Sequence, residues 1–175
     1  DVQSAFDVMR EVERSGILAF AAMDRLSYRI LQAHCAVPVL METQGDLDAA
    51  ARHTSVSDQG MTQIVDHLVS LGHQRFCHVS GPLTWWASRN RVEAYEGALA
   101  RHGAEARGTV DGAWSAESGF AAGLEIPLDA GVTAVVASND QMALGVLRAL
   151  SERGLPVPEQ MSGTGLDEMP ESEYL

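Results

Sequence analysis

Residues 133–158, TAVVASNDQMALGVLRALSERGLPVP, constrain the fold more than any other stretch of this chain. The β-branched, apolar run at 133–137 is typical of a buried parallel strand. Residues that often begin helices follow at once, and Gly154 with Pro156 forms a helix stop. Between them, apolar residues recur at helical spacing, namely Ala143, Val146, Leu147 and Leu150. The stretch therefore predicts a strand, a tight polar turn and a helix.

Two roles are open for Asn139 and Asp140, which stand in that polar turn. In an open α/β sheet, ligands bind beyond the carboxyl ends of the strands, where helix N-termini also point their free N–H groups. Asn139 and Asp140 thus stand where a ligand would be held. They can equally serve only as helix caps, and this stretch by itself favours the cap.

The same alternation of strand and helix runs through the rest of the chain. Strands are expected at 17–23, 37–41, 76–80, 109–111 and 161–166, and helices at 2–12, 26–31, 57–71, 87–102 and 116–124. A polar connector without clear periodicity, residues 45–54, interrupts the pattern. We therefore expect an α/β protein with two doubly wound parallel-sheet lobes. The N-terminal lobe, residues 1–56, would be incomplete, and residues 57–175 would form the C-terminal lobe.

Charge and hydropathy exclude several classes of protein. The net charge is −12 and all twelve basic side chains are arginine, so the surface should repel nucleic-acid phosphates. No apolar run approaches the ~18 residues that a membrane span needs. The first residues show no signal-peptide pattern, but the chain begins with Asp1 rather than Met, so this absence carries little weight. Cys35 and Cys77 are isolated in apolar settings, which predicts buried free thiols in a reducing compartment such as the cytoplasm.

Motifs for catalysis, cofactors and metals are weak or missing. Gly163-Thr164-Gly165 lacks the third glycine of a dinucleotide fingerprint, and no nucleophile elbow of the form GxSxG occurs. His67 and His73 lack a cysteine or acidic partner at ligand spacing. The sequence therefore predicts no catalytic residues, no cofactor and no metal site.

Polar and aromatic side chains follow the end of each predicted strand in the C-terminal lobe. They are Trp85, Trp86, Arg89 and Arg91 after 76–80, Trp114 and Ser115 after 109–111, Asn139 and Asp140 after 133–137, and Asp167 after 161–166. Each one taken singly is more often structural, but in a parallel sheet all of them gather at one edge. Carboxylate and guanidinium groups bind paired hydroxyls, and an indole covers the apolar side of a sugar ring. Together they favour a site for a polyhydroxylated ligand, with the neighbouring Trp86 assigned to packing.

Four stretches, 65–99, 112–120, 133–158 and 165–174, carry a resemblance to a known family. They contain the ordered motifs GHxRxxHVSGP, RxR, WSAESG, NDxMALG and GxD. Over residues 57–175 this pattern resembles the lactose-repressor (LacI/GalR) family of bacterial transcription regulators, and residues 1–56 match more loosely. The family's helix-turn-helix head, first N-terminal strand and last crossovers have no counterpart here, and Leu166 stands where an aromatic residue is common.

The resemblance implies a two-lobed core similar to a periplasmic sugar-binding protein, with a sugar or sugar derivative as effector. It places Arg91, Trp114, Asn139 and Asp167 on effector-contact positions and Trp85 near the sugar. It also implies a homodimer, and a hinge-type change that reaches operator DNA only through a head domain. A periplasmic sugar-binding protein of a transport system, which shares the fold, is the alternative function. An enzyme of the doubly wound class is a third hypothesis, for which the motifs give no support.

Overall fold

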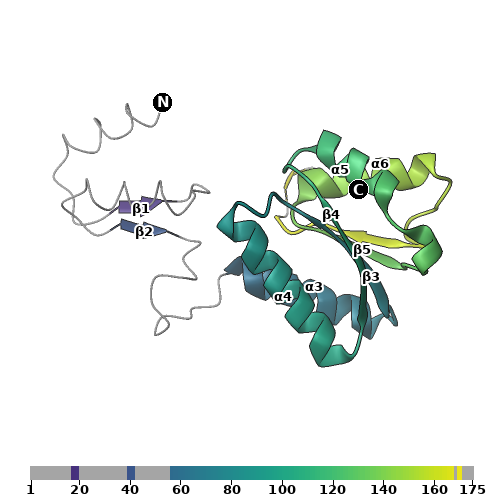
Figure 1. The fold of residues 1–175 in the computed structure, drawn as a ribbon, viewed down its shortest axis with the longest axis horizontal. Coiled ribbons are helices and arrows are strands. Elements are labelled where there is room, and N and C mark those ends of the chain that lie inside the picture. The colour runs from purple at the N-terminus through teal and green to yellow at the C-terminus, as the bar shows by residue number, and fades with distance from the viewer. Residues whose placement is uncertain (1–16, 20–38, 42–55, 168, 171–175) are drawn as a thin grey trace. The chain divides into compact units, whose positions relative to one another are not determined.

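A computed structural model describes residues 17–19, 39–41, 56–167 and 169–170 (Figure 1). The chain divides into two compact units, residues 1–55 with 84–87, and residues 56–83 with 88–175. In the first unit, β1 (Ile17–Ala19) pairs in parallel with β2 (Val39–Met41). Both strands lie inside the expected ranges. The helices expected at 2–12 and 26–31 and the connector at 45–54 lie outside the described residues.

The second unit is built on a parallel sheet whose strand order is β4-β3-β5-β6. The strands are β3 (Arg75–Ser80), β4 (Glu105–Asp111), β5 (Ala134–Ala137) and β6 (Ser162–Thr164). Residues of β3 and β5 are almost entirely buried, as the apolar run at 133–137 predicts for a strand that is covered on both faces. The expected α/β class with a parallel sheet is confirmed.

Helices cover both faces of this sheet (Figure 1). On one face, α3 (Val56–Ser70) and α4 (Trp86–His102) share a buried apolar cluster with Phe76, Ala134 and Val136. On the other face, α5 (Ala116–Glu125) and α6 (Asp140–Glu152) pack on alternate residues of the same strands, Cys77, Val79, Val135 and Ala137. None of the described helices has the length and hydropathy that crossing a bilayer requires.

A topological switch point lies between the neighbouring strands β3 and β5. The chain leaves β3 for α4 on one face of the sheet and leaves β5 for α6 on the other face. Two chain segments therefore diverge at the carboxyl ends of these strands. In open α/β sheets such a divergence creates the crevice in which ligands bind. Topology thus marks the carboxyl end of β3 and β5 as the candidate site.

The strands differ in extent from their expected ranges. β4 covers Glu105–Asp111 instead of 109–111, and its residues are largely exposed. It is an edge strand, so pairing with β3 extends it through polar residues that carry no apolar signal. β6 covers Ser162–Thr164 instead of 161–166 and ends before Gly165, which packs against Asp140. A short 3₁₀ helix, Leu128–Ala130, was not expected.

Glycines allow α5 and α6 to cross with their backbones in contact. A Cβ atom on Gly145 would lie 2.0 Å from the carbonyl oxygen of Ala116 and 2.3 Å from the amide nitrogen of Phe120. A Cβ atom on Gly119 would lie 2.2 Å from the carbonyl oxygen of Met142. These neighbours are backbone atoms and cannot move aside as a side chain can. The two helices therefore pack this closely only because both positions are glycine.

Replacing Gly145 with alanine should destabilise the chain by about 1–3 kcal/mol, because the added methyl group overpacks the helix crossing. Gly97→Ala in α4 is the matched control, since a Cβ atom there meets nothing within 4 Å. That substitution should be neutral or stabilise by up to about 1 kcal/mol, because alanine restricts the unfolded chain. Urea unfolding of both variants measures the difference. Equal midpoints would show that the α5–α6 crossing does not require Gly145.

Candidate ligand-binding site

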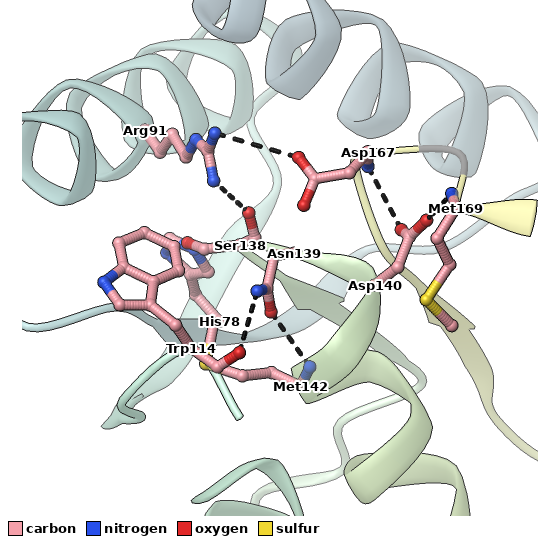
Figure 2. A network of polar contacts seen from close by, with 9 residues as sticks. All are labelled: His78, Arg91, Trp114, Ser138, Asn139, Asp140, Met142, Asp167 and Met169. Atoms are coloured by element: carbon pink, nitrogen blue, oxygen red, sulfur yellow. Dashed lines mark hydrogen bonds and ion pairs between the residues drawn. The ribbon is translucent and has the colours of Figure 1, made fainter. Parts of the chain in front are cut away.

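Arg91 lies on α4, with its side chain 13% exposed, and points across the carboxyl ends of the strands (Figure 2). Its Nη1 donates a hydrogen bond to the backbone carbonyl of Ser138. Its Nη2 lies 3.9 Å from a carboxylate oxygen of Asp167, whose side chain is 50% exposed. The guanidinium carbon lies 5.4 Å from the centre of the Trp114 ring, which is within cation–π range. The guanidinium thus touches the turns after β4, β5 and β6.

Trp114 adopts a strained backbone conformation in the turn after β4. Its φ is +68°, a left-handed value that a bulky residue rarely takes. The carbonyl oxygen of Trp114 accepts a hydrogen bond of 3.0 Å from the Asn139 amide. The indole occupies the space beside Gly81, where a Cβ atom would lie 2.2 Å from the ring. Backbone strain of this kind persists only where surrounding contacts determine it, and it is concentrated at functional sites.

Asn139 is the helix cap that the sequence favoured, and it has a second contact. Its side-chain oxygen accepts a hydrogen bond of 2.9 Å from the backbone N–H of Met142, which caps α6. Its amide nitrogen donates to Trp114 as described above, so this side chain ties the turn after β4 to the turn after β5 (Figure 2). The capping role and a ligand-binding role are compatible, because the amide nitrogen carries two hydrogens.

Two carboxylates near the end of β6 have different environments. Asp140 is 8% exposed and accepts backbone hydrogen bonds from Asp167 at 3.1 Å and from Met169 at 2.8 Å. It therefore holds the turn that carries Asp167. Burial raises the pKa of Asp167, the charge of Asp140 adds to this effect, and the Arg91 guanidinium opposes it. Asp140 is thus a support for the turn, and Asp167 is the carboxylate that faces Arg91.

Trp85 belongs to a different compact unit from these four side chains. It lies in the turn between β3 and α4, is 39% exposed, and belongs to residues 84–87, which group with the first unit. Arg89 helps to close the same turn by donating a hydrogen bond of 2.8 Å to the carbonyl of Leu83. The structure therefore brings Arg91, Trp114, Asn139 and Asp167 together, and a role for Trp85 stays a prediction.

Sequence reasoning missed His78 and Ser138 as parts of this network. His78 on β3 is fully buried, and its Nε2 lies 2.9 Å from the Ser138 hydroxyl. Burial lowers the pKa of His78 to about 4, with a further contribution from the Arg91 charge. The available signal was a histidine between Cys77 and Val79 in the predicted buried strand FCHVS. A polar side chain at a buried strand position needs a partner there.

Metal and thiol chemistry have no support in this part of the molecule. Among the described residues, no three His, Cys, Asp or Glu side chains come together in a way that could hold a metal ion. Cys77 is buried and unpaired, and burial raises the pKa of its thiol to about 11, which keeps it protonated and unreactive. The prediction of a buried free thiol is confirmed for Cys77. The arrangement is suited to hydrogen bonding and stacking.

Comparison with known proteins agrees with this fold. Residues 65–175 match the family model of the periplasmic binding protein-like domain. The lactose operon repressor of Escherichia coli K12 is 33% identical over 161 residues, which are 90% of this chain and 44% of the repressor. The regulator AscG of the same organism is 40% identical over 114 residues, 63% of this chain and 34% of that protein. The chain therefore spans less than half the length of these relatives.

Solved structures show the same likeness. The crystal structure of the Lac repressor bound to ONPG in the repressed state superposes with a TM-score of 0.80 at 30% identity, over 99% of this chain and 54% of that one. The fold and the sequence match define a periplasmic binding protein-like domain. Within that class, the chain belongs to the lactose-repressor (LacI/GalR) family of transcription regulators, as its motifs predicted.

The buried His78 predicts that the chain loses stability in mild acid. Unfolded histidine binds a proton near pH 6.5, whereas folded His78 does so only near pH 4. Between these values the unfolded state binds more protons, so stability falls as the pH falls through this window. The expected loss from His78 is roughly 2 kcal/mol between pH 7.5 and pH 5.

Urea unfolding of the wild type and of His78→Phe at both pH values measures this effect. All other titrating groups are shared, so the variant should show the smaller loss on acidification. Parallel pH profiles for the two proteins would contradict the assignment of a depressed pKa to His78.

Proposed function

We propose that this chain is the effector-sensing and dimerisation core of a bacterial DNA-binding transcription regulator that works in the cytoplasm. Its effector is a sugar or sugar derivative, and operator DNA is bound through a head domain outside these residues. The curated relatives named above are a repressor and a transcriptional regulator, which favours regulation over the alternative of a periplasmic sugar-binding protein in transport. The same relatives give no support to an enzyme.

The Arg91–Asp167 pair is the observation that carries this proposal. The two charged groups approach from α4 and from the turn after β6, at the switch point of the sheet. The pair is 3.9 Å apart and the Asp167 side chain is 50% exposed, so a ligand can reach the carboxylate beside the guanidinium. A carboxylate and a guanidinium arranged in this way can bind adjacent hydroxyl groups of one sugar ring.

Trp114 and Asn139 complete the proposed contacts. The half-buried indole offers an apolar surface for the C–H side of a sugar ring. The Asn139 amide, which is held by its bonds to Met142 and Trp114, supplies a hydrogen-bond donor in a fixed orientation. Trp85, in the turn after β3, is proposed as an additional contact. Because the backbone turns hold these groups before any ligand arrives, little ordering entropy is lost on binding.

Removing either member of the charged pair should weaken effector binding. Arg91→Ala and Asp167→Ala each leave polar ligand groups without partners, which costs roughly 1–3 kcal/mol, or about tenfold to a hundredfold in affinity. Calorimetry with ONPG, and then with a panel of neutral mono- and disaccharides, measures the change. Arg148→Ala is the matched control, since Arg148 forms an exposed ion pair with Glu152 on α6.

The control variant should bind as the wild type does, and all variants should melt within a few degrees of it. If Arg91→Ala and Asp167→Ala bind the effector as tightly as the wild type, the ligand lies elsewhere. If the wild type binds no sugar of the panel, the proposed effector class is wrong.

The chain, together with the flanking segments that its relatives have, should form a homodimer. Helix α3 combines buried residues such as Met61 and Val65 with partly exposed apolar ones such as Ile64, so it can serve a core and an interface. Sedimentation as a monomer at micromolar concentration would contradict the predicted dimer.

The isolated core should have no affinity for DNA, because its net charge of −12 opposes contact with phosphates. A salt-sensitive mobility shift of DNA by the isolated core would contradict this prediction.

A further inference from the structure

His78 has a buried polar environment that the proposed binding contacts do not use. Besides the hydrogen bond to Ser138, its ring lies 4.7 Å from the ring of Tyr95, at an interplanar angle of 38°. Its Nδ1 is buried and has no hydrogen-bond partner among the described residues. Because burial keeps the imidazole neutral at pH 7, only one of its two nitrogens carries a hydrogen.

That hydrogen belongs on Nε2. A buried N–H group without an acceptor costs more free energy than an unused nitrogen lone pair, because a desolvated donor loses its hydrogen bond to water outright. With the hydrogen on Nε2, His78 donates to the Ser138 hydroxyl and Nδ1 is left as the lone pair. The direction of this hydrogen bond makes the Ser138 oxygen the acceptor.

Ser138 is held at three points. Its N–H donates a bond of 2.9 Å to the carbonyl of Val79, its hydroxyl accepts from His78, and its carbonyl accepts from Arg91. The first backbone bond of α6 runs from the N–H of Ala143 to the carbonyl of Asn139. The Ser138 carbonyl therefore precedes the helix and has no helical N–H partner, which leaves it for Arg91.

His78 also supports the helix that carries Arg91. Tyr95, which packs on the imidazole, stands four residues after Arg91 on α4, so both side chains lie on the same side of that helix. His78 thus contacts Ser138, whose carbonyl accepts the hydrogen bond from Arg91 (Figure 2). Through Tyr95 it also contacts α4, the helix that carries Arg91.

We propose that His78 is a positioning residue of the effector site, which acts through Ser138 to aim the Arg91 guanidinium at the carboxyl edge of the sheet. The inference that this aim serves effector binding rests on the proposed function. A purely structural His78 would fill the core and stabilise the fold without affecting the orientation of Arg91. The two roles differ in what a change at residue 78 does to Arg91.

The first experiment needs no ligand. The side-chain Nε–Hε signal of Arg91 is recorded in ¹⁵N-resolved spectra of the whole chain and assigned with Arg91→Lys. His78→Phe replaces the imidazole with an aromatic ring that can still pack on Tyr95 but has no donor, and Ser138→Ala removes the acceptor. Both should move the Arg91 signal toward that of an exposed arginine. His78→Gln, which keeps a side-chain N–H donor, should restore much of the wild-type signal.

Tyr95→Phe is the matched control. The Tyr95 hydroxyl is buried without a hydrogen-bond partner among the described residues, so its removal keeps the packing on His78 and breaks no described hydrogen bond. This variant should leave the Arg91 signal unchanged. An Arg91 signal in His78→Phe that matches the wild type would overturn the proposal, whatever happens to the stability of the variant.

The second experiment measures binding of ONPG, or of the neutral sugar that binds the wild type in calorimetry. His78→Phe should weaken binding about fivefold, the size expected for loss of one hydrogen bond that orients a contact residue. In Arg91→Ala protein the same change should have no further effect, because the group that it positions is gone. Equal effects in both backgrounds would show that His78 acts on binding by another route. Failure of the wild type to bind any sugar would count against the proposed function, and the spectra would still decide whether His78 positions Arg91.

Discussion

The turn between β5 and α6 is the constraint on which the rest of the C-terminal unit depends. Ser138 connects it to β3 through the carbonyl of Val79, and to α4 through Arg91. Asn139 connects it to the turn after β4 and begins α6. Apart from the local cap to Met142, these bonds join segments that are far apart in the sequence. Ser138 and Asn139 therefore hold β3, α4, the turn after β4 and α6 together at the topological switch point of the sheet. This explains why the polar side chains converge there.

Polarity changes along the interface between α4 and the sheet. Toward the amino ends of the strands this interface is apolar, with Phe76, Ala98 and Leu99 in one buried cluster. Toward the carboxyl ends it becomes polar, with His78, Ser88 and Ser138 all fully buried. The same two surfaces thus supply a stabilising core at one end and a hydrogen-bonded framework for Arg91 at the other. Apolar burial offsets the desolvation of the polar groups, which by themselves would contribute little net stability.

The two carboxylates at the end of β6 show how a supporting group and a binding group differ. Asp140 is buried and its hydrogen bonds go to backbone N–H groups, so its position is determined by the fold. Asp167 is half exposed and faces a guanidinium at a distance longer than a hydrogen bond, so it can exchange that partner for a ligand. Local sequence does not separate them, because each is an aspartate in a turn after a strand. The separation depends on Gly165, which packs against Asp140 so closely that a Cβ atom there would lie 2.0 Å from an oxygen of the carboxylate.

The sequence by itself determined the βα order, the helix stop at Gly154 and the residues that follow each strand, because these depend on local periodicity and backbone preference. It also pointed to Arg91, Trp114, Asn139 and Asp167, since parallel strands bring their carboxyl ends to one edge. Only the tertiary structure decided that Asp140 supports a turn, that β4 extends through polar residues, and that His78 bonds to Ser138. Those outcomes depend on contacts between residues that are 27, 31 and 60 positions apart, and no local pattern encodes such pairings.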